Sequence, residues 1–223
     1  MNKIKNFYDR VQFPGTYEIS QLKNIKNRYL LTIDIAMSNV SSVLDVGCGT
    51  GLIANLFAFR YPDVEFTAID FARSIEFGKK FASNNQIKNV NFVRQDFLEF
   101  NTSQKYDVVI CQGVLHHIPN RVDALAKLKQ LTNKTLVLGI YHPWGKWAKK
   151  WFNINYQNEI LRQDQEEHPY ETAFTCQQVI DMLPEFELRC SYPTNINILS
   201  HLNSLFNYRN GGLITYVFRR IND

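Results

Sequence analysis

The sequence contains little cysteine, and its four cysteines are widely spaced, at positions 48, 111, 176 and 190. None forms a C-x-x-C pair, which argues against a zinc site and against a disulfide framework. No apolar run reaches the roughly 18 to 20 residues of a membrane-spanning helix. The N-terminus, Met-Asn-Lys-Ile-Lys-Asn-Phe-Tyr, contains no apolar stretch typical of a secretory signal. We therefore expect a cytoplasmic protein with reduced thiols and no membrane insertion.

An excess of charge of one sign is also missing. The formal net charge is +4 over 223 residues, of which 45% are hydrophobic and 21% are charged. This mild positive charge permits nucleic-acid binding but does not favour it. There are no internal repeats or low-complexity tracts. The composition predicts one domain spanning residues 1–223, large enough for a full core.

The central part of the chain alternates strand and helix patterns. The predicted strands are 41–46, 64–69, 90–94, 106–111 and 135–141. Helices are predicted at about 51–60 and 73–83, and a third is capped by Asn120 and buries Val122, Leu125, Leu128 and Leu131. Such an alternation implies a parallel sheet with helices on both faces.

The flanking segments follow other patterns. Residues 6–17 form an aromatic loop, and Leu22, Ile25, Tyr29, Ile33 and Ala36 then recur at helical spacing. After residue 141 the alternation pauses over 142–174. It resumes with a capping box at Thr175–Gln178, which begins a helix ending near Pro184. Two further strands are predicted at 186–191 and 213–219, separated by a second insertion at 193–211.

The most informative segment reads Val-Leu-Asp-Val-Gly-Cys-Gly-Thr-Gly at residues 43–51. A strand here runs into a glycine loop and then into a helix. Glycine permits close approach of a ligand, and a helix N-terminus favours an anionic group, so the segment predicts a nucleotide-type site. Position 52 is Leu, so the spacing is G-x-G-x-G and not the G-x-G-x-x-G of dinucleotide-binding proteins.

Two more pairs of residues follow predicted strands at the carboxyl edge, where ligands of open parallel sheets bind. Asp70 is placed to accept hydrogen bonds from both hydroxyls of a ribose, and Phe71 to cover an adenine ring. Asp96 suits the adenine amino group, with Phe97 as a second apolar wall, although Asp96 as a plain surface acid is an open alternative.

In order and spacing these blocks resemble the class I S-adenosylmethionine (SAM) dependent methyltransferases, closely over residues 40–141. The resemblance implies a doubly wound, Rossmann-like α/β sheet of seven strands in the order 3-2-1-4-5-7-6, with the last strand antiparallel. It implies SAM as cofactor and S-adenosylhomocysteine as product. The residues that it places at the cofactor are Asp45, Gly47, Cys48, Gly49, Gly51, Asp70, Phe71, Asp96, Phe97, Cys111, Gln112 and His117.

Within that family, Cys111 and Gln112 would touch the methionine part of the cofactor. Cys48 is expected as a small packing residue beside it and not as a nucleophile. One of the adjacent histidines His116 and His117 is expected to satisfy backbone groups in the loop beneath it. Adjacent histidines point apart and no carboxylate completes a ligand set, so no metal is expected.

The string Val-Leu-His-His-Ile-Pro at 114–119 resembles the small-molecule branch of the family, which includes quinone and sterol methyltransferases. The Asn/Asp-Pro-Pro-aromatic motif of enzymes that methylate nucleobase or glutamine amines is missing after the fourth strand. We therefore expect direct displacement of the methyl group onto O, N or C of a small-molecule acceptor. Such a reaction depends mainly on alignment.

The acceptor is expected under the two insertions, 142–174 and 193–211, which would form a cap. Tyr141 and His142 end the fifth strand and would face it. His168 lies in the segment Asp-Gln-Glu-Glu-His-Pro-Tyr-Glu at 164–171 and is a candidate general base, with an incidental histidine in a solvated loop as the alternative. The aromatic residues of 1–39, Tyr8, Phe13 and Tyr17, either close over the cofactor as a lid or pack in the core.

Three other functions stay open at this point. One is an enzyme that uses SAM for a decarboxylation or cyclisation, and another is a non-catalytic SAM-binding subunit. The third is an RNA methyltransferase that uses the basic, tryptophan-rich segment 144–151. We expect that nucleic acid is not the partner and that the protein is a monomer or a homodimer.

Overall fold

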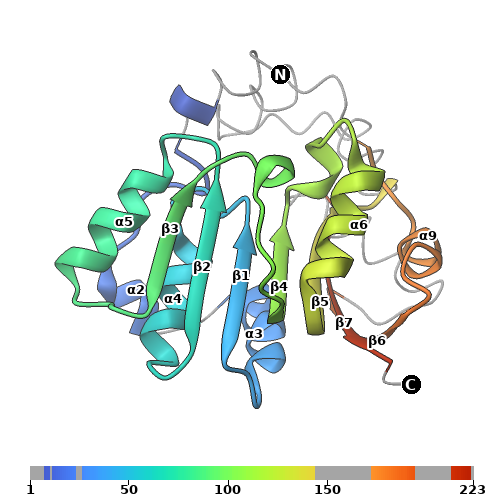
Figure 1. Ribbon diagram of the computed structural model, residues 1–223, viewed down its shortest axis with the longest axis horizontal. Coiled ribbons are helices and arrows are strands. Elements are labelled where there is room, and N and C mark those ends of the chain that lie inside the picture. The colour runs from blue at the N-terminus through green and yellow to red at the C-terminus, as the bar shows by residue number, and fades with distance from the viewer. Residues whose placement is uncertain (1–7, 11, 24–26, 144–171, 194–211, 222–223) are drawn as a thin grey trace.

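The computed structural model describes residues 8–10, 12–23, 27–143, 172–193 and 212–221. Its centre is a seven-stranded sheet in the order β3-β2-β1-β4-β5-β7-β6 (Figure 1). The strands are β1 (Ser42–Val46), β2 (Glu65–Asp70), β3 (Val90–Arg94), β4 (Tyr106–Gln112), β5 (Thr132–Tyr141), β6 (Phe186–Tyr192) and β7 (Leu213–Arg220). Strands β1 to β5 pair in parallel, and β7 is antiparallel to both of its neighbours. The expected strand order and the antiparallel last strand are confirmed.

Helices cover both faces of this sheet. One face carries α3 (Arg28–Asp34), α4 (Leu52–Arg60) and α5 (Ile75–Asn84), and the other carries α6 (Arg121–Leu131) and α9 (Cys176–Asp181) (Figure 1). The remaining elements are α2 (Ile19–Lys23) and the 3-10 turns η1 (Ile35–Met37), η2 (Phe97–Glu99) and η3 (Leu115–His117). None of the helices among the described residues has both the length and the apolar composition needed to cross a bilayer.

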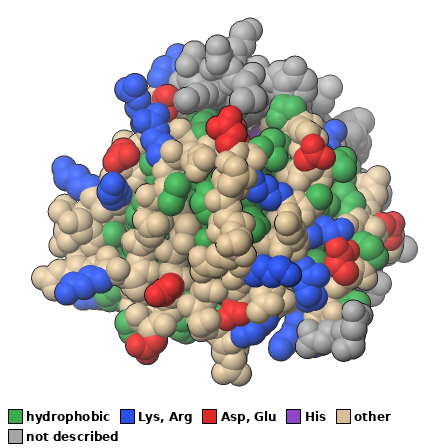
Figure 2. All heavy atoms as spheres, in the orientation of Figure 1, with side chains coloured by type: hydrophobic (Ala, Val, Ile, Leu, Met, Phe, Trp, Pro, Cys, Tyr) green, Lys and Arg blue, Asp and Glu red, His purple; other side chains and the backbone are tan. Residues whose placement is uncertain are grey.

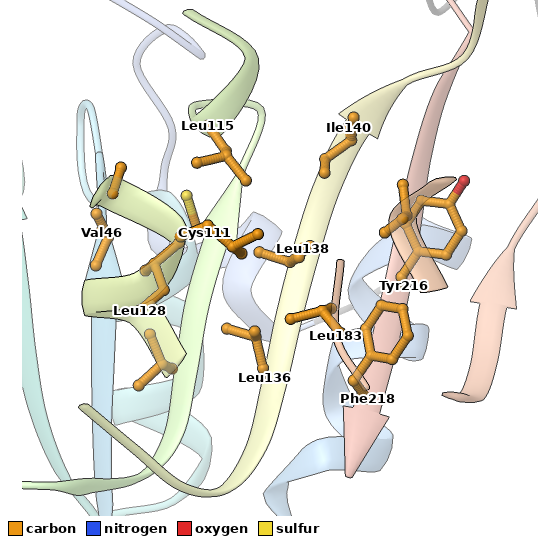
Figure 3. Packing of buried hydrophobic residues seen from close by; sticks show 14 of the residues in the cluster. Val46, Cys111, Leu115, Leu128, Leu136, Leu138, Ile140, Leu183, Tyr216 and Phe218 are labelled. Atoms are coloured by element: carbon orange, nitrogen blue, oxygen red, sulfur yellow. The ribbon is translucent and has the colours of Figure 1, made fainter. Parts of the chain in front are cut away.

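The period-2 alternation of the strands divides the core between the two faces. On β4, Val109 and Cys111 pack with α6 and α9, whereas Val108 and Ile110 pack with α3 and α4. Figure 3 shows the first of these cores, including Cys111 and Leu128. Because the central strands are buried on both sides, only the ends of the sheet are left to form a site.

The helix signals in the sequence are only partly confirmed. Thr175 and Gln178 form the expected capping box. The prediction for α6 is wrong in two details, because the Asn120 side chain donates to Asp123 instead of capping the helix, and Val122 is 76% exposed. The single N-terminal helix is also wrong, since Ile19–Lys23 and Arg28–Asp34 are separate helices. Asn27 begins the second of these and accepts a hydrogen bond from the N–H of Tyr29, and such a cap marks a new start.

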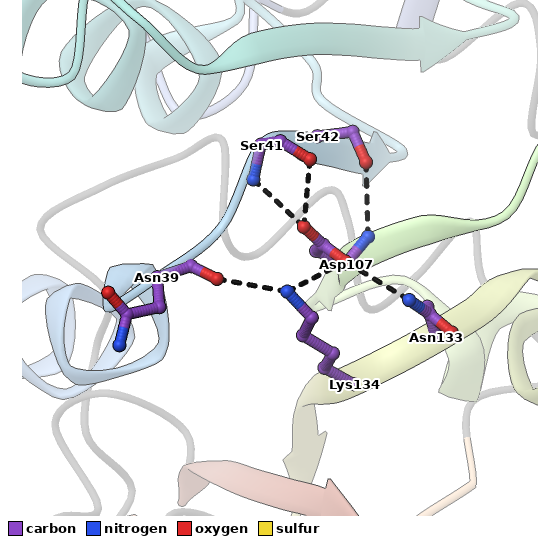
Figure 4. A network of polar contacts seen from close by, with 6 residues as sticks. All are labelled: Asn39, Ser41, Ser42, Asp107, Asn133 and Lys134. Carbon is purple, nitrogen blue, oxygen red and sulfur yellow. Dashed lines mark hydrogen bonds and ion pairs between the residues drawn. The ribbon is translucent and has the colours of Figure 1, made fainter.

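A polar network closes the amino end of the central strands (Figure 4). The Asp107 carboxylate accepts hydrogen bonds from the N–H of Ser41 at 2.8 Å, the Ser41 hydroxyl at 3.0 Å and the Asn133 amide at 3.1 Å. Lys134 lies 3.2 Å from it and also donates to the carbonyl of Asn39. These contacts join the starts of β1, β4 and β5 at the edge opposite the glycine loop.

The hydrogen bonds of this network set the pKa of Asp107. Burial alone would raise it, but the hydrogen bonds from Ser41, Asn133 and Lys134 outweigh burial and hold the pKa below the ordinary 3.8. Elsewhere on the face in Figure 2, acidic and basic side chains of the described residues are interspersed. That face therefore carries no field of one sign.

Replacing Asp107 with asparagine should lower the free energy of unfolding by about 2 kcal/mol at pH 7, because several part-buried hydrogen bonds lose a charged acceptor. A folded-state pKa below the unfolded value stabilises the protein above pH 3.8, and this contribution disappears as the pH falls through the folded pKa. Urea unfolding of both proteins at pH 7 and pH 3 measures it, and the difference should shrink at pH 3. An exposed acid, Asp63→Asn, is the control, and an equal loss in both variants at pH 7 would contradict the role of the network.

Candidate functional site

The glycine loop joins β1 to α4 at the carboxyl edge of the sheet. Gly47, Gly49 and Gly51 have φ values of +70°, +56° and +76°. The N–H groups of Gly47 and Cys48 donate to the carbonyl of Ile69 at 2.8 and 3.0 Å, and that of Gly51 donates to the carbonyl of Cys48. The loop therefore takes its shape from hydrogen bonds within the chain, most of them to the end of β2.

Gly49 occupies the most crowded position of the loop. A Cβ built there would lie 2.2 Å from the carbonyl oxygen of Phe13, and its φ is in the left-handed region. Its N–H donates to the Asp70 carboxylate at 2.7 Å. The residue thus sits between the N-terminal segment and the end of β2, and only glycine fits both contacts.

Thr50 ties the loop to the N-terminal segment through all of its polar groups. Its N–H donates to the carbonyl of Phe13 at 2.9 Å, its hydroxyl donates to that of Gly15, and its carbonyl accepts from the Tyr17 hydroxyl. The Asn55 amide donates to the same hydroxyl at 2.7 Å and to the carbonyl of Gly78. Tyr17 is buried, so of the two expected roles, lid or core residue, it has the second. Its hydroxyl also supports the loop through the carbonyl of Thr50.

Two carboxyl groups lie next to this loop. Asp70 accepts from the N–H of Gly49 with one oxygen and from that of Ala72 with the other, at 2.7 and 2.8 Å. Asp45 is 2% exposed, and its Oδ2 has no hydrogen-bond partner among the described residues. Burial, and then the charge of Asp70, raise the pKa of Asp45 to about 7. Burial also raises the pKa of Asp70 itself.

The other residues expected at the adenine end are distributed as follows. Phe71 is half-buried and meets the ring of Tyr8 edge-on at 6.1 Å. Asp96 accepts from the N–H of Leu98 and so begins η2. Phe97 is 6% exposed and packs in the core, with Lys127 over its ring.

The N-terminal segment also reaches the ends of β2 and β3. Asp9 accepts from the N–H of Arg73 at 2.8 Å and lies 3.5 Å from Arg94. With the contact of Tyr8 on Phe71, residues 8–10 and 12–17 touch the loops after β1 and β2 and the end of β3. The sequence signalled their aromatic character but not these contacts.

The end of β4 presents two residues in opposite directions. Cys111 is fully buried in the core with α6, and burial raises the pKa of its thiol to about 12. Burial likewise raises the pKa of Cys48 well above its ordinary value, in line with a packing role. Gln112 lies on the other face, where its amide donates to the Thr215 hydroxyl at 2.8 Å. Its Oε1 is buried and has no partner among the described residues.

Histidines and a tyrosine gather after β4 and β5. The ring of His116 lies 4.1 Å from that of His117 and 4.3 Å from that of Tyr141, measured between centroids, so the expectation that the two histidines point apart is wrong. His116 and His142 are fully buried. His168, most of the insertion 142–174 and nearly all of 193–211 lie outside the described residues, as does the basic segment 144–151.

Comparison with known proteins gives a consistent result. A family model described as "Methyltransferase domain" matches residues 38–195. A malonyl-[acyl-carrier protein] O-methyltransferase of Acetivibrio thermocellus is 28% identical over 166 residues, which is 73% of this chain and 57% of that protein. A ubiquinone biosynthesis O-methyltransferase of Rickettsia bellii is 37% identical over 100 residues, 44% of this chain and 38% of that protein. The chain thus spans about half the length of such relatives, or less.

A solved structure agrees in fold. It is an N-methyltransferase from Bradyrhizobium japonicum in complex with S-adenosyl-L-homocysteine, with a TM-score of 0.65 and 15% identity, covering 99% of this chain and 100% of that one. At this identity the likeness establishes the seven-stranded architecture and leaves the chemistry to be argued from the residues.

Replacing Gly49 with alanine should lower the free energy of unfolding by about 3 kcal/mol, from left-handed strain together with the displaced Phe13 carbonyl. The matched control is Gly113→Ala, where φ is +76° and, apart from its chain neighbours, no described residue lies within 4 Å of the added Cβ. There the loss should be about 1 kcal/mol. Denaturant unfolding followed by circular dichroism measures both, and equal losses would show that the Phe13 contact is unimportant.

Replacing Asp45 with asparagine should flatten the dependence of stability on pH. A folded-state pKa near 7, above the unfolded 3.8, means that the native state keeps a proton that the unfolded state has lost. Stability is therefore full below pH 3.8 and falls as the pH rises through 7, by roughly 2 to 3 kcal/mol between pH 5 and pH 8. Unfolding at several pH values should show this fall in the wild type and in Glu65→Gln, an exposed control, but not in Asp45→Asn. A parallel fall in Asp45→Asn would refute the assignment.

Proposed function

This chain belongs to the methyltransferase domain family, and we propose that it transfers a methyl group from SAM to O, N or C of a small-molecule acceptor, with S-adenosylhomocysteine as the product. The observation that carries the proposal is the glycine loop, held by Asp70 and bordered by two buried oxygen acceptors, those of Asp45 and Gln112. The names of the relatives, O- and N-methyltransferases, support a small-molecule acceptor.

The residues of this edge fit the proposed cofactor. SAM carries a sulfonium, an ammonium and two ribose hydroxyls, all of which favour oxygen acceptors or negative charge. Asp70 uses one hydrogen bond on each oxygen, and a carboxylate oxygen accepts two, so each retains the capacity for a ribose hydroxyl. Asp45 and Gln112 each offer a buried oxygen without a partner among the described residues. A hydrogen bond from a ligand to such an oxygen is stronger than the same bond in water, because the local dielectric constant is low.

We assign the further cofactor contacts to the loop residues Gly47, Cys48, Gly49 and Gly51, to Phe71 and Asp96 at the adenine end, and to Cys111 and His117 at the methionine end. For Cys111 the side chain is buried in the core, so its part in binding would be played by the backbone. Phe97 packs in the core, and we propose that it shapes the adenine end of the site by anchoring the loop after β3.

When bound, SAM supplies an electrophilic methyl group on sulfur whose leaving group is a neutral sulfide. The chain then has mainly to align the acceptor and exclude water. We propose that Tyr141 and His142 face the acceptor and that His142 or His168 takes a proton where the acceptor arrives protonated. The insertions 142–174 and 193–211 are proposed as its cap. Four free cysteines support a reducing, cytoplasmic setting.

Calorimetry should detect binding of SAM and S-adenosylhomocysteine, and no binding of NAD, whose glycine spacing the loop does not have. Asp70→Ala should weaken SAM binding at least about tenfold, because ribose hydroxyls lose a charged acceptor, whereas the exposed control Asp63→Ala should leave it unchanged. Incubation with methyl-labelled SAM and a metabolite extract should yield labelled products and S-adenosylhomocysteine by mass spectrometry. Absence of SAM binding by the wild type would reject the proposal, and binding without any turnover would favour a non-catalytic role.

A further inference from the structure

Gln112, Gly139 and Thr215 form one row across three neighbouring strands. In the register of the sheet, Gly139 of β5 is paired with Gln112 of β4 on one side and with Thr215 of β7 on the other. Paired residues of adjacent strands project from the same face. Glycine in the middle of the row leaves the space that the Gln112 side chain crosses to reach the Thr215 hydroxyl, 2.8 Å away.

The space over Gly139 admits no side chain. A Cβ built there would lie 2.5 Å from the Gln112 Oε1 and 2.7 Å from its Nε2. The next row toward the amino end, Ile110, Val137 and Val217, is apolar and belongs to the core. The Gln112 row is therefore the first polar row above the core on this face.

We propose that Thr215 is a positioning residue of the methyl-donor site: it holds the Gln112 amide so that Oε1 is presented to a donor group of the ligand, and Gly139 provides the space for this arrangement. The inference rests on the proposed function for the identity of the ligand. The group that Oε1 would recognise is an N–H donor, and the methyl donor supplies one in the ammonium of its amino-acid part.

The polar atoms of the Gln112 amide are unevenly satisfied. Its Nε2 donates to the hydroxyl of Thr215, which is 2% exposed, and this bond holds the side chain across the row. Its oxygen is left buried without a partner among the described residues. A buried acceptor of this kind destabilises the protein unless something donates to it, and it discriminates strongly for a ligand that does.

Binding calorimetry with two probes tests whether the ammonium is the donor. S-adenosylhomocysteine carries the amino-acid part, and 5′-methylthioadenosine lacks it. If the ammonium is the donor, Thr215→Val should weaken S-adenosylhomocysteine about tenfold, the order of magnitude of one lost buried hydrogen bond, with 5′-methylthioadenosine unchanged. Thr215→Ser, which keeps the hydroxyl, should bind like the wild type. Thr135→Val, a buried threonine at the other end of β5, is the control for loss of a hydroxyl in this sheet.

Two further variants make the test independent of folding defects. In a Gln112→Ala background, Thr215→Val should have no additional effect on binding. Gly139→Ala should mimic Thr215→Val in the wild-type background and be tolerated in Gln112→Ala, because the added methyl then meets no amide. This pattern would support the inference with the ammonium as donor.

Other outcomes overturn it. If Gln112→Ala weakens S-adenosylhomocysteine but Thr215→Val does not, the positioning role is wrong and the proposed function stands. If Thr215→Val weakens the binding of both probes equally, or weakens binding as much in the Gln112→Ala background, Thr215 does not act through the Gln112 amide and the inference is wrong. If no Gln112 or Thr215 variant alters either probe, the ammonium is excluded and the inference fails at this site. A wild type that binds neither probe removes the proposed function and the inference with it.

Discussion

The hydrogen bond from the N–H of Gly49 to the Asp70 carboxylate is the contact on which the site depends. It joins the loop after β1 to the end of β2, and the neighbouring N–H groups of Gly47 and Cys48 bind the carbonyl just before Asp70. The N–H of Thr50 donates to the carbonyl of Phe13, so the four successive N–H groups of residues 47–50 all form hydrogen bonds within the chain. The loop is thus a rigid scaffold whose binding capacity lies in the remaining lone pairs of Asp70 and in the space that glycine leaves open.

A second consequence concerns charge. Asp45 is buried beside the loop, and burial disfavours its ionised form. The nearby charge of Asp70 disfavours it further, so the pKa of Asp45 rises to about 7. A site that holds two acids in this way is destabilised near neutral pH as long as nothing positive compensates. A cationic ligand would relieve that repulsion, so the electrostatics of the loop and the proposed preference for a sulfonium donor have the same origin.

The sequence predicted much of the fold because its strongest signals are local. Apolar β-branched runs located all seven strands to within three residues, and Thr175 with Gln178 located a helix start. Two predictions failed at the start of α6, where the Asn120 side chain donates to the nearby Asp123 and Val122 is exposed in spite of its helical spacing. The contacts of the N-terminal segment with the glycine loop could not be predicted, because no local periodicity encodes a contact with a distant residue, such as the hydrogen bond from the N–H of Thr50 to the carbonyl of Phe13.

The same limit explains why Gln112 was found and Thr215 was not. Gln112 lies at the carboxyl end of a strand, where ligands of parallel sheets bind. Thr215 lies 103 residues further along the chain, in a strand whose sequence pattern is ordinary. Only the insertion of β7 beside β5 brings the two onto one row, and only a glycine between them lets them meet. The antiparallel strand is therefore more than an addition to the edge of a parallel sheet. It supplies the hydroxyl that accepts the hydrogen bond of the Gln112 amide, and this bond ties the orientation of a residue at the carboxyl end of β4 to the topology of the whole sheet.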